Sequence, residues 1–369
     1  MKQFIPISAL LLALVPGGCA HETTSANYAT IAVDLQHVDK CETDDYTEVF
    51  TEPRYTLLRS LDKNDMIGTA DKVVVTDDLI YVADFRNNKV VSYSKRGIPQ
   101  KVLCRIGRGP GEYLLLCDFC VDEDGNLYVN DARLNKVIKY DAGFNFMNDW
   151  EIRYDIESFE MLDNNKFLAV LSAWNEGKYE NIELALLNGE MEVETPVIMY
   201  DEFVDRNVEI AHAVLCKTDR GIFYHRTIDD NVYLLDNDGN ITEKYHFSFG
   251  EQSVRDKERL NVEKYWDNFK NRTFLCGQIV VFPENVYGTL CDKMENRQFV
   301  WTRGSNEIRI ENCQDEIPNI GMICGVAGNR LITYIPASDF DATRNFEGFN
   351  LTDMDVDDYS LVLCTYEIE

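Results

Sequence analysis

The sequence predicts an all-β fold, a single six-bladed β-propeller built from four-stranded antiparallel blades. The first observation is an internal repeat, because residues 80–93 (IYVADFRNNKVVSY) and 127–140 (LYVNDARLNKVIKY) are identical at eight of fourteen positions and lie 47 residues apart. The second is the pattern inside each copy, in which two short apolar runs flank a polar turn. Such a unit at a period of roughly 40–50 residues is typical of propeller blades. A chain of 369 residues with 45% apolar residues can fill one large domain of this kind.

The remaining units follow from the same pattern of strands and turns. The stretch Asp124-Gly125-Asn126, before the second copy, has hairpin-turn chemistry. A fainter copy lies at residues 221–241. Three further strand-rich segments, at residues 165–190, 286–304 and 329–369, bring the total to six units. Propellers must close their ring, commonly with an N-terminal strand. We therefore expect residues 31–35 to pair with the C-terminal strands near 361–366.

One segment, residues 250–274, departs from the strand pattern. It is charged, and its apolar residues Val254, Leu260, Tyr265 and Phe269 recur at helical spacing. We interpret it as a short helical insertion between two blades. Insertions in repeat folds map to one face, often the face that binds a partner, although a charged helix is also a common solvated cover.

The N-terminus resembles a bacterial lipoprotein signal. Lys2 precedes an apolar run, and the small residues Gly17 and Gly18 precede Cys19. The run is too short to span a membrane, so we expect an exported chain. The predicted division is a signal peptide over 1–18, a lipidated tether over 19–28 and the propeller over 29–369. Lipid on Cys19 would anchor the protein to a membrane without spanning it.

Composition limits the partners and the redox chemistry. The net charge of −28 repels the phosphate backbone, which excludes nucleic acid as a partner, and argues against direct adhesion to anionic lipid. Ten cysteines remain besides Cys19. Disulfides are permitted in an exported protein, but a chain of this length does not need them to fold, and their pairing stays open.

The glycine-rich stretch Gly107-Arg108-Gly109-Pro110-Gly111 is predicted to be a turn between blades. It lacks both the GxGxxG pattern and the Gly-Lys-Ser/Thr ending of phosphate loops, and a strand-like run follows it. With its flanking repeats, IGRGPGEYLLLCDFCVD resembles the six-bladed β-propeller lipoproteins of Gram-negative gut-type anaerobes, which are similar in architecture to NHL-repeat propellers. In that family a GxGPGE[YF] loop joins the first two recognisable blades. The resemblance is sharpest over residues 65–145 and implies the fold and an envelope location, with the outer membrane favoured, but no established activity.

Two aspartates end equivalent runs of the repeat, and each is followed two residues later by an arginine. These are Asp84 with Arg86 and Asp131 with Arg133. Their recurrence indicates a structural role, either as carboxylates that bond turn amides or as Asp–Arg pairs between neighbouring blades.

Four other residues are candidates for binding. His225 and Arg226 stand where the clearer copies have Ala-Asp and Asn-Asp, and a departure from a repeat is where function tends to appear. His225 either faces a pocket or is a satisfied or exposed histidine. Arg108 and Glu112 have no packing reason to be those residue types. They either form a salt bridge that pins the glycine loop or contact a ligand at the rim of the ring.

Two classes of function fit these features. The preferred hypothesis is a non-enzymatic, membrane-anchored envelope scaffold that binds a protein partner or small ligand, for example within an outer-membrane uptake complex. The alternative is a metal-dependent lactonase or lyase, whose divalent cation would be held in the central channel by Glu, Asp and Asn side chains from several blades. No metal site or cofactor is predicted from motifs, because Asp122-x-Asp124-Gly125 and Asp236-x-Asp238-Gly239 fit hairpin turns better than calcium loops.

Overall fold

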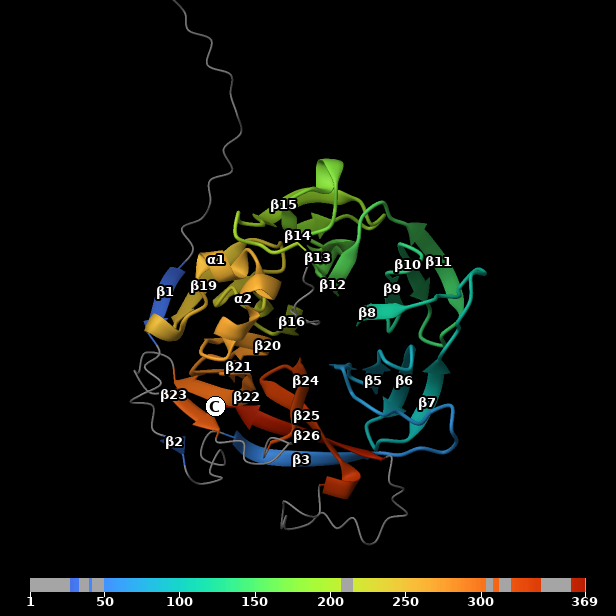
Figure 1. The fold of residues 1–369 in the computed structure, drawn as a ribbon. Helices are drawn as coiled ribbons and strands as arrows, with labels where there is room; N and C mark the ends of the chain where they lie inside the picture. The colour runs from blue at the N-terminus through green and yellow to red at the C-terminus, as the bar shows by residue number, and fades with distance from the viewer. Residues whose placement is uncertain are drawn as a thin grey trace, which may run out of the picture.

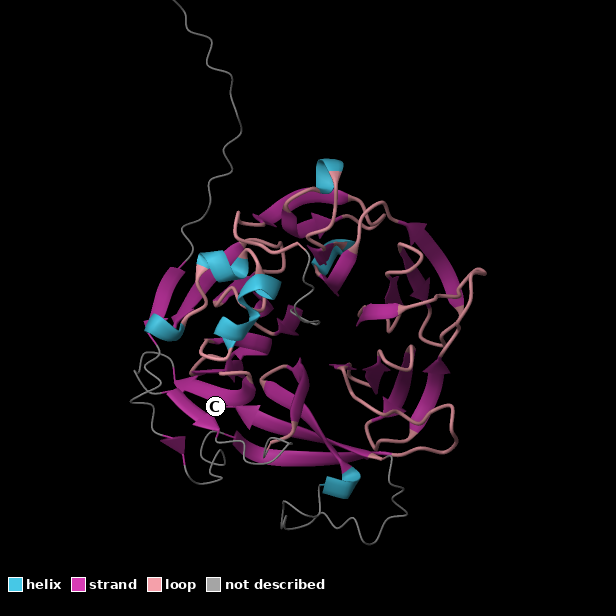
Figure 2. Cartoon of the chain, in the orientation of Figure 1, coloured by secondary structure: helices cyan, strands magenta, loops and turns pink. Residues whose placement is uncertain are grey.

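The repeats form six antiparallel sheets arranged around a common axis, which Figure 1 shows end-on. The structure is a computed structural model, and it describes residues 27–32, 40–41, 50–206, 215–302, 308–311, 320–339 and 360–368. Strands dominate, and the helices are short (Figure 2). The predicted six-bladed β-propeller is confirmed. The signal peptide and Cys19 lie outside the described residues.

Each blade contains four antiparallel strands, and five of the six blades are continuous in sequence. Blade one comprises β4 (Lys72–Val75), β5 (Leu79–Asp84), β6 (Lys89–Ser94) and β7 (Pro99–Leu103). Blade two comprises β8 (Leu116–Val121), β9 (Leu127–Asp131), β10 (Lys136–Tyr140) and β11 (Phe146–Glu151). Blade three comprises β12 (Ile156–Met161), β13 (Phe167–Leu171), β14 (Ile182–Leu187) and β15 (Val193–Met199).

The second half of the ring repeats this arrangement. Blade four comprises β16 (Leu215–Thr218), β17 (Gly221–His225), β18 (Asn231–Leu235) and β19 (Ile241–Ser248). Blade five comprises β20 (Thr273–Val281), β21 (Asn285–Asp292), β22 (Glu295–Thr302) and β23 (Ile308–Glu311). Blade six comprises β24 (Met322–Ala327), β25 (Arg330–Pro336), β26 (Leu361–Ile368) and the early strand β3 (Phe50–Leu58).

The order of strands gives the ring two different faces. The first strand of each blade lies at the channel edge of its sheet, as β8, β12, β16, β20 and β24 show in Figure 1. Because successive strands are antiparallel, the turns after the second strand and the connections after the fourth strand emerge on the same face. We call this the loop face.

The N-terminal part closes the ring, but through a different strand from the one expected. β3 pairs with β26, from Leu58 opposite Leu361 to Phe50 opposite Ile368. The predicted pairing of residues 31–35 with this edge is wrong, since β1 (Asn27–Ala32) pairs in parallel with β19 and β2 (Lys40–Cys41) with β23. Residues 33–35 lie outside the described residues. The closing strand must lead directly into blade one, and β3 is the strand that immediately precedes it.

The core lies between neighbouring blades, where each sheet packs on the next. At the junction of blades two and three, the Tyr128 ring meets Phe167 edge-on with ring centroids 5.1 Å apart, and Phe159 lies beside Phe167. Phe247 and Phe299 form an equivalent edge contact at 5.7 Å between blades four and five. Large aromatic side chains fill the wedge between twisted sheets, which explains their frequency in the sequence.

The aspartates of the repeat bond backbone amides. Asp84 accepts hydrogen bonds from the amide of Gly68, in the connection that enters its own blade, at 2.8 Å, and from the turn amide of Asn87 at 2.9 Å. Asp131 accepts in the same way from Leu114 at 2.8 Å and from its own turn. The side chains of Arg86 and Arg133 are exposed and form no ion pair with the described residues. These contacts match the interpretation in which the aspartate carboxylates bond turn amides.

The insertion is helical and lies between blades four and five. After a 3₁₀ turn, η4 (Gly250–Gln252), come α1 (Asp256–Arg259) and α2 (Val262–Phe269). Asn261 caps α2, since its side chain accepts from the amide of Lys264. Of the apolar residues used to predict it, Phe269 is buried, but Leu260 is half exposed. Among the described residues, the 3₁₀ helices η2 (Asp163–Asn165) and η3 (Gly177–Tyr179) lie in turns of blade three.

The closure can be tested at Gly97, whose backbone has a positive φ and lies against β3. A Cβ at this position would come within 1.9 Å of the Leu57 carbonyl oxygen, whereas Gly177 has a similar φ and open space. We expect Gly177→Ala to lower the free energy of unfolding by about 1 kcal/mol through its backbone conformation alone. Gly97→Ala must also displace β3 and is expected to cost about 2 kcal/mol more. Urea denaturation measures both, and equal losses would contradict the packing of β3 against blade one.

Candidate functional site

Every residue that the sequence marked as a binding candidate is on the loop face. Arg108 and Glu112 lie in the connection between β7 and β8, and His225 and Arg226 lie where β17 ends. The insertion joins the fourth strand of blade four to blade five on the same face. These candidates nevertheless belong to two separate places, one beside blade two and the other at the junction of blades three and four.

The glycine loop is organised by Glu112. The Glu112 carboxylate accepts the amide of Gly109 at 2.7 Å, and a Cβ at Gly107 would lie 2.0 Å from that carboxylate. Gly107 therefore leaves the space in which the glutamate folds back onto the loop. The exposed Arg108 side chain extends from the same loop. Glu112 is thus occupied within the loop, and Arg108 is the residue of the pair that is open to solvent.

His225 is buried, whereas Arg226 is half-buried, and the two have different surroundings. The Nδ1 atom of His225 lies 3.1 Å from the Asn231 carbonyl oxygen, and burial lowers the pKa of His225 to about 4. The histidine is therefore neutral at pH 7. Arg226 stacks on the Tyr200 ring at 5.3 Å, and its Nε lies 3.6 Å from a Glu183 carboxylate oxygen. Its buried Nη1 has no hydrogen-bond partner among the described residues.

Glu183 completes a buried cluster with Arg226 at the junction of blades three and four. Its carboxylate accepts the Tyr224 hydroxyl at 2.6 Å, and only 5% of the residue is exposed. Burial raises the pKa of Glu183 to about 7, against the opposing effect of Arg226. The sequence interpretation missed Glu183. The signal that could have found Glu183 is a glutamate inside the apolar run of β14. This strand belongs to the blade before the one whose repeat pattern is broken by His225-Arg226.

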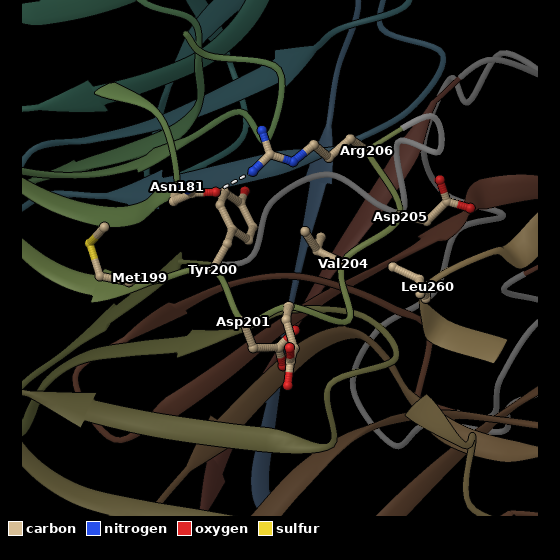
Figure 3. Close-up of a pocket in the computed structure, with 9 residues that line it drawn as sticks. Asn181, Met199, Tyr200, Asp201, Val204, Asp205, Arg206 and Leu260 are labelled. Atoms are coloured by element: carbon tan, nitrogen blue, oxygen red, sulfur yellow. Dashed lines mark hydrogen bonds between the residues drawn. The ribbon is translucent and has the colours of Figure 1, made fainter. Parts of the chain in front are cut away.

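Tyr200 connects this cluster to an open pocket of about 600 Å³ on the loop face, shown in Figure 3. We call it the blade-three pocket, because most of its lining follows β15. Met199 lies on one side of the pocket in Figure 3 and Leu260 of the insertion on the other. Arg206 donates a hydrogen bond to the Asn181 side chain, as the dashed line shows. The remaining lining is Asp201, Glu202, Val204 and Asp205.

The insertion forms the outer wall of the blade-three pocket through charged contacts. Arg259 lies 2.6 Å from Asp201 of the pocket and 3.4 Å from Asp229 of blade four. The Asp205 carboxylate accepts the first amide of α2 at 2.8 Å. Within the insertion, Glu258 is buried against Arg272. Burial alone would raise the pKa of Glu258, but hydrogen bonds to the carboxylate, chiefly from Arg272, outweigh it and lower that pKa to about 2. The insertion is therefore attached to both blades, and Leu260 is held at the pocket.

A second pocket, of about 460 Å³, opens where the inner strands β8 and β12 begin. We call it the channel-mouth pocket. Its walls are largely apolar, with Asp155, Glu157 and Ser172 among them, and the remaining lining is Phe85, Leu115, Leu116, Cys117, Ala132, Ile156, Ala173 and Trp174. The indole NH of Trp174 donates to the carbonyl oxygen of Arg206, which lines the blade-three pocket. Trp174 therefore lies between the two pockets.

Below this pocket, three inner strands are joined by a buried ion network. The Lys72 ammonium of β4 lies 2.9 Å from Asp118 of β8 and 2.6 Å from Glu160 of β12. Asp118 also accepts the Ser158 hydroxyl at 2.7 Å. Burial alone would lower the pKa of Lys72, but the two carboxylates outweigh it and raise that pKa. The sequence interpretation missed these residues too, although each is a charged side chain inside the apolar run of an inner strand.

Large apolar side chains are exposed mainly on the loop face. In the described part of the chain, seven of the nine exposed ones follow the second or fourth strand of a blade or end such a strand. These are Leu61, Ile106, Trp174, Met199, Leu260, Trp266 and Met294. The other two, Phe146 and Met147, begin β11 near the opposite face. Exposed apolar groups gathered on one face of a ring are typical of an interaction surface.

The described residues hold no group of three or more His, Cys, Asp or Glu side chains placed to bind a metal ion. In the same part of the chain, no helix has the length and apolar character needed to cross a membrane. The eight cysteines whose side chains the structure describes are free thiols, among them Cys117 at the channel-mouth pocket and the exposed Cys104.

The sequence matches a family of known proteins over most of its length. A family model described as "Domain of unknown function (DUF4934)" matches residues 30–355. The chain belongs to this family. No curated protein matches the chain in sequence.

Solved structures share the fold at low sequence identity. The "Putative exported protein (BF0058)" of Bacteroides fragilis NCTC 9343 has a TM-score of 0.73 and 14% identity, over 93% of this chain and 100% of that one. A member of the DUF4221 family from Bacteroides vulgatus ATCC 8482 has a TM-score of 0.55 and 10% identity, over 87% of this chain and 98% of that one. At such identities these structures show the propeller fold, which the DUF4934 chain shares with them.

The buried Glu183 makes the stability of the protein depend on pH. Its pKa is about 7 in the folded state and near 4.5 when exposed, so its contribution to stability is complete below pH 4.5 and is lost as the pH rises through 7. Relative to Glu183→Gln, the wild type is expected to lose on the order of 3 kcal/mol of unfolding free energy over this range. Urea denaturation at several pH values measures the difference.

A second variant keeps this prediction specific to the carboxyl group. Tyr224→Phe removes the hydroxyl that stabilises the ionised Glu183, so the folded-state pKa of Glu183 should rise further and the loss of stability should continue to a higher pH than in the wild type. The same dependence on pH in the wild type and in Glu183→Gln would show that Glu183 is not the group responsible.

Proposed function

We propose that this chain is an exported, lipid-anchored scaffold of the cell envelope that holds a protein partner on its loop face. The observation that carries the proposal is the concentration of exposed apolar side chains on that face. Two pockets open there, and a rigid ring supports them. A wide rigid face with apolar anchors and hollows is suited to a protein–protein interface.

The location rests on the N-terminal sequence. The apolar run before Cys19 resembles a lipoprotein signal, and a structural relative from Bacteroides fragilis is named as an exported protein. A lipid on Cys19 would hold the ring at the membrane surface. The outer membrane is the location that the family resemblance favours, and an outer-membrane uptake complex is one setting in which such a scaffold would serve. The charge of −28 supports a protein partner over nucleic acid.

The anchor is tested by replacing its cysteine. We expect the wild type expressed in its own host to incorporate labelled palmitate and to remain with the membranes, because acylation of Cys19 provides the anchor. Cys19→Ser should lose both the label and the membrane association. Cys104→Ser, which changes an exposed free thiol of the propeller, should keep both. Persistent labelling of Cys19→Ser would contradict the anchor.

The interface is tested with a photo-reactive amino acid placed at Leu260 or, as a matched control, at Met147. Both side chains are about half exposed, at 50% and 53%, but only Leu260 is on the loop face. Irradiation of native membranes should cross-link one partner in stoichiometric amount to position 260 and not to position 147. Leu260→Ser combined with Trp266→Ser should reduce capture of this partner about tenfold, whereas Met147→Ser should not. Capture through position 147 alone would place the interface elsewhere.

A further inference from the structure

We propose that the channel-mouth pocket binds the arginine or lysine side chain of a basic, partly apolar segment of the protein partner. The inference rests on the proposed function, because it specifies what the partner places on the loop face. Three features of the pocket lead to it: apolar walls, carboxylates inside the pocket and the open ring of Trp174 at its rim.

The walls suit the aliphatic part of a long side chain. Phe85 and Ala132 come from turns of blades one and two and Leu115 from the connection between these blades, and the three surround the pocket with partly buried apolar surface. A volume of about 460 Å³ exceeds what one methyl or one ion needs, and it falls in the range of sites that enclose most of a small ligand. Arginine and lysine place three or four methylenes before their charge, so they can bury a stem against such walls.

The charges in the pocket favour a cation. Asp155 and Glu157 are half-buried and flank Ile156 at the start of β12. The Asn175 side chain accepts the Asp155 amide at 2.8 Å and donates to its carbonyl oxygen at 3.0 Å, which fixes the backbone that carries the carboxylate. An incoming cation therefore meets a carboxylate whose backbone is already held in place. The net charge of −28 adds a long-range attraction for basic partners.

Trp174 supplies a surface for the cation at the rim. The residue is 55% exposed, and its indole NH donates to the Arg206 carbonyl oxygen, so one edge of the ring is held while other parts stay open. A guanidinium or ammonium over such a ring is attracted by the negative face of its π-system. The same fold already pairs cations with rings internally, since the Lys139 ammonium lies 4.8 Å from the Tyr128 ring centroid.

The surface beyond the pocket indicates a segment of a protein as the source of this cation. Across Trp174 lies the blade-three pocket, with Met199 and Leu260 half exposed on its two sides. The only basic residue in the lining of that pocket, Arg206, lies 3.8 Å from Glu180, whereas Asp201, Glu202 and Asp205 are acidic. A free amine would fill one pocket and leave this surface exposed. A segment with basic and apolar residues in alternation would cover both pockets.

The test uses the full-length protein and fluorescent synthetic peptides of alternating arginine and leucine. Fluorescence anisotropy gives the affinity for this peptide, for one with glutamate in place of arginine, for one with serine in place of leucine, and for arginine amide as a competitor. We expect the arginine–leucine peptide to bind at least tenfold more tightly than the two altered peptides. Added salt should lower the affinity for the arginine–leucine peptide, because the contact is between opposite charges.

Variants locate the binding in the pocket. The affinity for the arginine–leucine peptide should fall about tenfold in Trp174→Ala. It should fall by a similar factor in the double variant Asp155→Asn, Glu157→Gln. Asp149→Asn on β11, away from both pockets, should leave it unchanged. Equal affinity for the arginine and glutamate peptides, or affinity that the pocket variants do not alter, overturns the inference. Full competition by arginine amide at an affinity equal to that of the peptide also overturns it, because a small amine is then the ligand.

The two proposals fail differently. If photo-cross-linking at Leu260 captures a stoichiometric partner but Trp174→Ala and the carboxylate variants do not weaken it, the pocket inference fails and the scaffold function stands. If the peptide binds in the pocket as expected and no partner is captured from membranes on the loop face, the scaffold function fails.

Discussion

The ring depends on buried side chains that satisfy the backbone of the connections between blades. A connection that crosses from the outside of one sheet to the inside of the next cannot pair its amides and carbonyls within a ladder, and buried unpaired groups are costly. Here Asp84 and Asp131 accept amides of the connections that enter their blades, and the hydroxyls of Tyr93 and Tyr140 donate to carbonyl oxygens of the same two connections. The recurrence of these residues in the repeat follows from that requirement.

The channel adds a second tie between blades. Lys72 joins Asp118 and Glu160 from the inner strands of three successive blades, so that one buried ammonium faces two buried carboxylates. Such networks contribute more to the geometry of a site than to net stability, because desolvation cancels much of the attraction. The mouth of the channel opens directly above these strands. The network thus ties β8 and β12 to each other, and the first residues of both strands line the channel-mouth pocket.

The sequence predicted the fold well because the blade repeat is local. Residues 80–93 and 127–140 contain the strands, turns and anchoring aspartates of one unit, so two copies were enough to recognise the architecture. Closure was misassigned, since pairing between β3 and β26 joins the two ends of the chain and leaves no local pattern. The pockets were missed for the same reason. Phe85, Ala132 and Asp155 come from three different blades and become neighbours only when these blades assemble.

Blade four shows how a departure from the repeat creates a site. In blades one and two, an aspartate at the end of the second strand anchors the backbone, but here Arg226 follows β17 and cannot accept an amide. Asp230, at the end of the same turn, accepts the Leu275 amide of blade five at 2.9 Å instead. Arg226 is thereby released from the structural role and reaches back to Glu183 and Tyr200 of blade three. Tyr200 then forms the floor between this charged cluster and the blade-three pocket. Arg226, the residue that breaks the repeat pattern, therefore links the packed blades to the pocket on the loop face.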